Sequence, residues 1–256
     1  MRSNPISKGA EDLLIPTLTV VYHMDSRILE IRKHLKKKLD PMRFEHTLGV
    51  AYTCQALAMR YEYDLDKAEL AGLLHDCAKR FDGETLRVKC LSRNIPITEG
   101  EDRDPALLHA KLGAWMAREK YGIDDEEILS AIACHNTGKP GMSPLDKILY
   151  VADYIEPRRD KAANLLAMRK LAFEDLDQAC LSIMESTLSY LKSKNCPIDI
   201  MTVIACEDMR QVMKEKKTII IEKKEEQTFE SGKRNGKTRS RSVGREKGRR
   251  YKNHRY

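Results

Sequence analysis

The residues in this sequence best suited to chemistry are a histidine and an aspartate that stand side by side, His75 and Asp76. They follow an apolar run from Ala68 to Leu74 with the spacing of a helix, so both side chains come at the end of a buried element. An imidazole and a carboxylate in apolar surroundings cost free energy unless they find a charged or hydrogen-bonding partner. Because neutral imidazole and carboxylate are good ligands for first-row divalent metals, the pair predicts a metal site.

Three further histidines strengthen this prediction, because His46, His109 and His135 each fall on a separate predicted helix. A single histidine on an apolar helix is more often a core residue than a ligand, but one on each of four helices is harder to explain by packing. Asp153 adds a carboxylate with apolar residues on both sides, a setting in which it needs a cation.

The elements that must position these residues are helices. Asp40-Pro41, Asp104-Pro105 and Ser143-Pro144 each place an N-cap before a proline at the first helical position. Asp66 and Asp124, each three residues before a glutamate, predict two further helix starts. Other helices are expected over about 24–35, 85–91, 173–192 and 199–214. The only β-like run, 218–221, has no partner to pair with. The predicted fold class is therefore all-α, a single helical bundle.

The 256 residues carry a net charge of +7, and this charge is concentrated at the C-terminus. Residues 231–256 hold eleven Lys or Arg and one acid, whereas the rest of the chain is slightly acidic. We expect a helical domain over 24–215, preceded by a dispensable extension over 1–23 with Met24 as the natural start. Residues 216–256 are expected to form a basic, disordered tail. Binding of RNA or another polyanion by this tail and a solvated tail without a partner are equally compatible with the sequence.

Seven cysteines occur without a CxxC pair or regular spacing, which is typical of reduced thiols in a cytoplasmic protein. The apolar run from Leu13 to Tyr22 is too short for a membrane span, is broken by Pro16 and follows two acids. We therefore expect a cytoplasmic protein with no membrane segment. The sequence leaves open whether the chain forms a homodimer.

The order His46, His75-Asp76 and Asp153 matches the H…HD…D signature of the HD-domain metal-dependent phosphohydrolases. The segments that resemble one family of this superfamily more closely are Arg43 to Val50, Leu74 to Lys79, His135 to Ser143 and Lys147 to Arg159. That family is the YqeK family, the bacterial symmetrical diadenosine tetraphosphate hydrolases. The resemblance covers about residues 25 to 212, and the segment from His135 to Arg159 separates it from other HD proteins.

The resemblance implies a centre of two metal ions, and it implies iron. Asp76 would bridge the two ions, and the other ligands would be His46, His75 and Asp153 on the first ion and His109 and His135 on the second. The donor set alone also suits manganese or zinc. Two such ions can activate a water molecule and stabilise the developing phosphoryl charge. The expected reaction is attack of a metal-activated hydroxide on diadenosine tetraphosphate or a related dinucleoside polyphosphate, giving two ADP.

A polyphosphate substrate requires cations around the metals. Lys79, one turn after Asp76, is expected to act with Asp76 in catalysis and to contact a phosphate. Further substrate contacts are expected from residues beside the ligands: Arg43, Thr137, Lys139, Arg158 and Arg159.

Two other functions remain open at this stage. An HD-type nucleotidase or phosphodiesterase acting on other nucleotides would share the metal site, so a substrate panel is needed to separate it. An RNA- or ribosome-associated helical module with structural metals would instead bind through the basic tail.

Overall fold

The computed structural model describes the backbone of residues 15–160, 162 and 164–242, and the side chains of 26–223 except 161 and 163. Within these residues every regular element is a helix, which confirms the all-α prediction. The helices are α1 (Ile15–Lys38), α2 (Pro41–Arg60), α3 (Leu65–Leu74), α4 (Gly83–Leu91), α5 (Glu99–Arg103), η1 (Pro105–Leu108), α6 (His109–Tyr121), α7 (Glu126–Cys134), α8 (Pro144–Ile155), α9 (Leu165–Glu174), α10 (Leu176–Ser193) and α11 (Ile200–Ser242). The chain divides into two units, residues 1–209 and 210–256.

The predicted cap-and-proline starts lie where the sequence places them. Asp40 caps α2 by accepting a hydrogen bond from the backbone N–H of Arg43. Ser143 and Asp146 form a capping box at the start of α8, in which each side chain accepts the other residue's backbone N–H. These two caps fix the start of the helices that carry His46 and Asp153.

Two predicted caps were wrong by one or two residues. Asp64, rather than Asp66, caps α3, and Asp125, rather than Asp124, caps α7. In both cases the true cap has an extended backbone, and its carboxylate accepts hydrogen bonds from two N–H groups of the first turn. Neighbouring aspartates compete for this position, and spacing to the next glutamate does not decide between them.

Several helix boundaries also differ from the prediction. Neither α5 nor α9 was predicted, and α10 begins at Leu176 rather than near Phe173, which lies in α9. Helix α1 begins at Ile15, before the predicted start at Met24, and proline is tolerated in a first helical turn. The backbone of α11 is helical to Ser242, where disorder was predicted from residue 216; its Lys, Glu and Gln residues are good helix formers. Residues 1–14 and 243–256, at the ends of the predicted extension and tail, lie outside the described residues.

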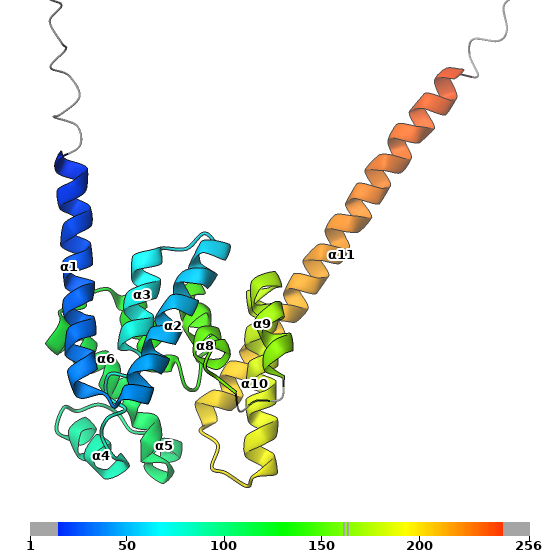
Figure 1. The fold of residues 1–256 in the computed structure, drawn as a ribbon. Helices are drawn as coiled ribbons and strands as arrows, with labels where there is room; N and C mark the ends of the chain where they lie inside the picture. Colours follow the sequence, from blue (N-terminus) through cyan, green and yellow to red (C-terminus); the bar gives the residue numbers. More distant parts are fainter. Residues whose placement is uncertain (1–14, 161, 163, 243–256) are drawn as a thin grey trace, which may run out of the picture. The chain divides into compact units, whose positions relative to one another are not determined.

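The core of the first unit forms where α2, α3 and α8 pack together (Figure 1). Helix α7 packs against α3 and α8. Leu57, Leu73 and Ile148 are fully buried here, one from each of the three helices. The backbones of α2 and α3 approach closely at Gly72, where an added Cβ would lie 2.6 Å from the Cα of Ala51. This close approach brings the C-terminal end of α3 beside α2, and with it His75 beside His46.

The cysteines are unpaired, as predicted, and all except Cys196 are buried. Among the helices that the structure describes, none combines the length and the apolar character that crossing a membrane requires.

Candidate metal centre

Most of the predicted metal ligands lie at helix ends that converge on one point. His75 is the C-cap of α3, with Asp76 directly after it, and His135 is the C-cap of α7. His109 begins α6, and Asp153 lies in the last turn of α8. His46 is the exception, because it lies inside α2, within two turns of its capped start. Helix ends leave backbone groups without intrahelical partners, so polar side chains there can be buried at low cost.

Three of the four imidazoles are oriented in the same way. The Nδ1 atom of each lies 2.5–2.8 Å from the carbonyl oxygen three residues earlier, in the pairs His75–Gly72, His109–Ala106 and His135–Ile132. Because a carbonyl oxygen only accepts hydrogen bonds, Nδ1 carries the proton in each of these rings. The Nε2 atoms therefore present lone pairs, and all three point into the same buried space. This tautomer and orientation are those of metal-binding histidines.

Asp76 lies between the histidines, and each of its carboxylate oxygens faces a different pair. Oδ1 lies 3.3 Å from Nε2 of His109 and 3.6 Å from Nε2 of His135. Oδ2 lies 3.6 Å from Nε2 of His75 and 3.9 Å from Nε2 of His46. A carboxylate with one oxygen toward each of two ligand pairs has the arrangement needed to bridge two cations.

Two of the buried acceptors in this space lack donors. Nε2 of His75 and Oδ1 of Asp76 are buried without a hydrogen-bond partner. Nε2 of His109 and Nε2 of His135 lie only 3.2 Å apart, although both rings hold their proton on Nδ1. Facing lone pairs beside a carboxylate are unfavourable unless a cation lies between them. The residues therefore fit a metal ion in two groups, which share Asp76: His46, His75 and Asp76, and Asp76, His109 and His135.

Asp153 and Glu156 complete the side of the centre that contains His46. Oδ1 of Asp153 lies 3.0 Å from Nε2 of His46 and 3.9 Å from Nε2 of His75. Glu156, the C-cap of α8, lies behind His46, with Oε1 3.1 Å from Nδ1 and a side chain only 2% exposed. Glu156 thus orients His46 with a carboxylate, as the backbone carbonyls orient the other three rings.

Glu156 was not predicted from the sequence. A glutamate between the end of a helix and a proline is usually a surface residue, and no spacing rule connects it to His46. One signal was present: Gly49 lies one turn after His46, and a Cβ at that position would come 2.5 Å from Oε2 of Glu156. A glycine inside a helix often marks such a close approach.

The ionisation of the centre favours cation binding. Burial lowers the pKa of His75 to about 4 and that of His109 to about 3, so both rings are neutral near pH 7. Burial raises the pKa of Asp76, but the charges and hydrogen bonds around it, the Lys79 ammonium among them, lower it more, and it lies well below its usual range. The hydrogen bond from His46 and the Arg159 guanidinium likewise outweigh burial at Asp153 and lower its pKa. The carboxylates of Asp76 and Asp153 therefore stay ionised beside the neutral rings of His75 and His109.

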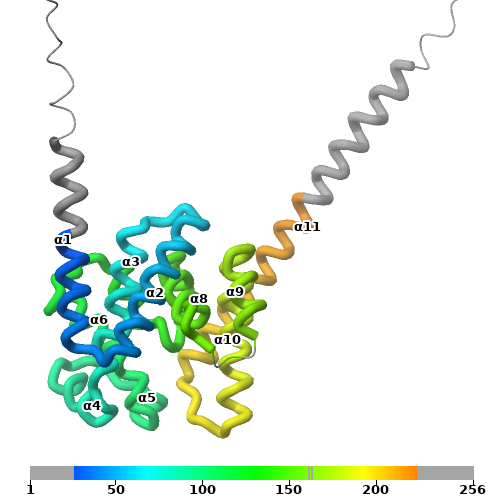
Figure 2. The backbone as a smooth tube through the Cα atoms, in the orientation of Figure 1, coloured from blue at the N-terminus to red at the C-terminus, as the bar shows by residue number. Residues whose placement is uncertain are grey.

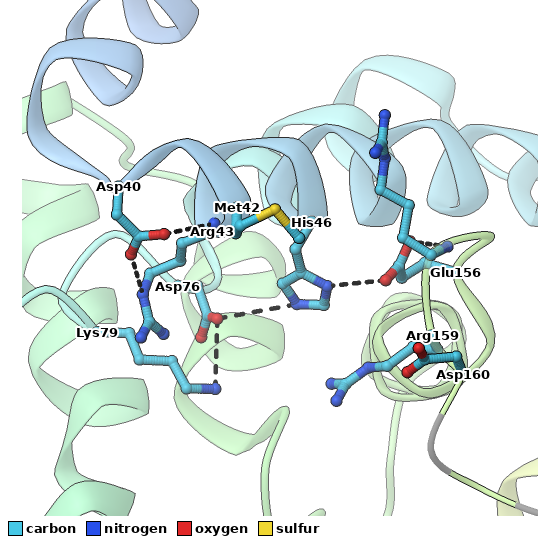
Figure 3. Close-up of a pocket in the computed structure, with 10 residues that line it drawn as sticks. Asp40, Met42, Arg43, His46, Asp76, Lys79, Glu156, Arg159 and Asp160 are labelled. Carbon is cyan, nitrogen blue, oxygen red and sulfur yellow. Dashed lines mark hydrogen bonds and ion pairs between the residues drawn. The ribbon is translucent and has the colours of Figure 1, made fainter.

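A cleft of about 430 Å³ opens onto the centre at His46 and Asp76, and four of its lining residues are cations: Arg43, Lys79, Arg158 and Arg159. Nζ of Lys79 lies 3.3 Å from Oδ2 of Asp76, and Nη2 of Arg159 lies 2.8 Å from Oδ1 of Asp153. Figure 3 shows Arg43 and Lys79 on one side of His46 and Asp76, with Arg159 on the other. Arg43 pairs with Asp40, and Arg158 pairs with Glu45.

The structure does not bring the other two predicted substrate residues to this cleft. Nζ of Lys139 lies 2.9 Å from Oδ2 of the fully buried Asp146 and also donates to the Ser130 hydroxyl. Thr137 is buried, and its hydroxyl donates to the carbonyl of Gly138. Both side chains are engaged within the loop after α7 and the helices beside it, and neither lines the cleft.

Comparison with known proteins agrees with this geometry. The HD domain family matches residues 43–158, a span that includes all six predicted metal ligands. A Bacillus subtilis protein named symmetrical bis(5'-nucleosyl)-tetraphosphatase is 40% identical over 164 residues, which cover 64% of this chain and 87% of that protein. A protein of the same name from Halalkalibacterium halodurans is 41% identical over 167 residues, with the same coverage.

A solved structure also matches this fold. It is the crystal structure of a Clostridium acetobutylicum protein described as a predicted HD superfamily hydrolase involved in NAD metabolism. The TM-score is 0.69 at 38% identity, and the match covers 71% of this chain and 96% of that one. With curated relatives matched over most of their length, and the HD residues gathered at one centre, this chain belongs to the symmetrical bis(5'-nucleosyl)-tetraphosphatase family of HD-domain proteins.

Proposed function

We propose that this chain is a hydrolase with two metal ions that cleaves diadenosine tetraphosphate symmetrically into two ADP. The observation that carries the proposal is the position of Asp76. Its two oxygens face separate histidine pairs, and the centre opens into a cleft lined by cations. The names of the relatives support this substrate and this symmetry of cleavage.

The six ligands divide between two positions in the proposal. His46, His75 and Asp153 would hold one ion, His109 and His135 would hold the other, and Asp76 would be shared. Iron is the proposed metal, and this nitrogen-rich set with two carboxylates also suits manganese or zinc. Two bound divalent ions supply Lewis acidity toward phosphoryl oxygens and activate water as a nucleophile.

The cleft cations bind and orient the tetraphosphate. Lys79 is 37% exposed and lies beside Asp76, so its ammonium can reach a phosphoryl oxygen at the centre and offset the charge that develops as ADP leaves. Arg159 uses Nε and Nη2 to bind Asp153, which leaves its other donors for a second phosphate. Arg43 uses Nε to bind Asp40, so both of its terminal nitrogens remain available on the opposite side.

The neutral imidazoles keep the centre ready for anionic substrate. At His75, His109 and His135 the Nδ1 proton is fixed by a backbone carbonyl, so none of these three rings has to rotate or lose a proton to present its lone pair. Such preorganisation is a common source of catalytic power, because the site does not reorganise during the reaction.

The test is chromatography of the products formed from diadenosine tetraphosphate by anaerobically purified, iron-loaded protein. ADP as the sole product is the expected result. ATP plus AMP would refute symmetric cleavage, and absence of turnover by protein shown to hold metal would refute the substrate. A panel of other nucleotides would then test the broader HD nucleotidase function.

A pair of matched variants tests the role of Asp76. Asp76→Ala is expected to lose both bound metal and turnover, whereas Asp124→Ala, at an exposed aspartate before α7, is expected to keep both. An Asp76→Ala protein that retained two ions and activity would contradict the shared-ligand role.

A further inference from the structure

The two histidines on the side of the centre away from His46 come from separate segments. His109 follows η1 at the start of α6, and His135 ends α7, 26 positions later. Their Nε2 atoms lie 3.2 Å apart. Zinc–nitrogen bonds are about 2.0–2.1 Å long, so two imidazoles whose Nε2 atoms are more than about 4 Å apart cannot bind one ion. The affinity of this side for an ion therefore depends on how firmly η1 is held beside the end of α7.

Asn136 connects these two segments. It follows His135 directly, and its Nδ2 donates to the carbonyl oxygen of Leu107 over 2.8 Å. The side-chain amide has this orientation because a carbonyl oxygen only accepts hydrogen bonds. Leu107 lies in η1, two residues before His109. One side chain thus joins the residue after one predicted ligand to the turn that leads into the other.

Two neighbouring carbonyls of η1 fix the position of His109. The carbonyl of Ala106 accepts the Nδ1 proton of the ring, and the carbonyl of Leu107 accepts the Asn136 amide. The backbone N–H of His109 also points at both carbonyls. A 3₁₀ turn such as η1 has poorer internal hydrogen-bond geometry than an α-helix. A contact from outside the turn therefore has more influence on where the turn lies.

The two sides of the centre are held in different ways. On the His46 side the buried carboxylate of Glu156 contacts the ring directly. On the other side a backbone carbonyl holds the ring of His109, and Asn136 holds that backbone. Groups behind the ligands of a metal site commonly tune its affinity.

We propose that Asn136 is a positioning residue, which sets the separation of His109 and His135 and thereby the affinity for the ion that they hold. This inference rests on the two-ion centre of the proposed function and deepens it. Asn136 acts through the backbone of η1 and is not itself a ligand in this proposal.

Asn136 also lines a second cleft, of about 700 Å³, which lies between α8, α9 and α10 and reaches the centre at His135. Figure 2 shows these three helices grouped together. A residue that only contacted a molecule bound in this cleft would change KM and leave metal binding unaltered. A positioning residue changes metal binding in the absence of any nucleotide, so the two roles give different results.

The test measures binding of cobalt(II) to the metal-free full chain, without nucleotide, by visible absorption. Asn136→Leu removes the donor and keeps the approximate shape of the side chain. It is expected to weaken one of the two ions about three- to tenfold, the range for loss of one neutral hydrogen bond, and to leave the other unchanged. Glu156→Gln is expected to weaken the other ion, which assigns the two binding steps. A variant with both substitutions should weaken each ion by the factor seen in the corresponding single variant.

Gln55→Met is the matched control. Nε2 of Gln55 donates to Oε2 of Glu69 over 2.8 Å, so this amide also joins two segments, α2 and α3, by a hydrogen bond of the same length. Both Asn136→Leu and Gln55→Met are expected to lower the free energy of unfolding of the metal-free protein in urea. Only Asn136→Leu is expected to change metal affinity.

Unchanged affinity for both ions in Asn136→Leu would overturn the inference, and so would equal weakening of both, which a general loss of stability would produce. A raised KM for diadenosine tetraphosphate with unchanged metal binding would overturn it as well, and would assign Asn136 to the second cleft. If the wild type bound two ions and did not hydrolyse diadenosine tetraphosphate, the proposed function would fail, and the cobalt titration would still decide the role of Asn136.

Discussion

Replacing Glu156 by glutamine removes the negative charge behind His46 and nearly preserves the shape of the side chain. In the structure Oε1 of Glu156 lies 3.1 Å from Nδ1 of His46, and Oε2 accepts the backbone N–H of Arg158 over 2.7 Å. A glutamine has one acceptor oxygen instead of two, so one of these contacts is also lost. Because the side chain is 2% exposed, water does not replace it.

The expected magnitude follows from the hydrogen bond that becomes neutral. Hydrogen bonds to charged groups contribute about 1.5–3 kcal/mol, against roughly 1 kcal/mol for neutral ones. The difference of about 0.5–2 kcal/mol corresponds to a roughly two- to thirtyfold loss of metal affinity, and the upper part of this range overlaps the roughly 10–100-fold typical of residues that orient a metal ligand. The loss should be confined to the ion on the His46 side, because Glu156 has no contact with His109 or His135.

The assay is metal analysis by mass spectrometry after dialysis against a series of chelator concentrations. Glu156→Gln should release one ion at a lower chelator concentration than wild type and retain the other. Gly49→Ala should act in the same way, since its Cβ would lie 2.5 Å from Oε2 of Glu156 and displace the carboxylate. Glu119→Gln, at an exposed glutamate of α6, is the control. Wild-type retention in both variants, or equal loss of both ions, would refute the reasoning.

Three other predictions concern the cations and the imidazoles. Lys79→Met should lower kcat for diadenosine tetraphosphate by about 10²–10³-fold and leave metal content unchanged, measured by steady-state kinetics and metal analysis; loss of metal would contradict a role toward substrate. Lys139→Ala should lower the free energy of unfolding in urea by about 1–3 kcal/mol, because Asp146 is buried, with kcat and KM unchanged; a change in KM without loss of stability would restore the substrate role. Chelator-treated protein should lose stability as the pH falls from 6.5 toward 4. Folded His75 has a pKa of about 4 and folded His109 a pKa of about 3, both below the usual histidine value. In this pH range the same histidines of the unfolded chain bind protons that the folded rings do not, and this favours unfolding. His75 alone contributes about 3 kcal/mol over this range. Titration of His46 has the opposite effect on stability. Burial lowers the pKa of His46, but the hydrogen bonds and charges of Asp153 and Glu156 raise it above the usual value. Urea unfolding at several pH values should show a net fall, and a rise would contradict the account.

The histidines and aspartates of the centre could be selected from the sequence because each one is an unusual residue type in an apolar helical context. His75-Asp76 follows a buried run, and Asp153 has apolar neighbours on both sides, so their chemistry stands out without knowledge of tertiary contacts. The helix ends that hold them are set by local capping, which is encoded within a few residues. This is why the start of α2 and the start of α8 were predicted at the correct residue.

The residues that sequence reasoning missed or misplaced depend on contacts between distant segments. Glu156 acts on His46, 110 positions earlier in the chain, and nothing local to either residue indicates the contact. Lys139 was taken for a loop cation, but it pairs with Asp146, whose carboxylate the sequence accounts for only as part of a helix cap. The second cleft is formed by α8, α9 and α10, and α9 was not predicted at all.

The most direct test of the account is a crystal structure of the metal-loaded protein with anomalous scattering measured at the absorption edge of the bound metal. The account predicts two anomalous peaks, one near His46, His75 and Asp153 and the other near His109 and His135, with one oxygen of Asp76 bound to each. A single peak, or two peaks of which Asp76 contacts only one, would contradict the shared centre on which the proposed hydrolysis depends.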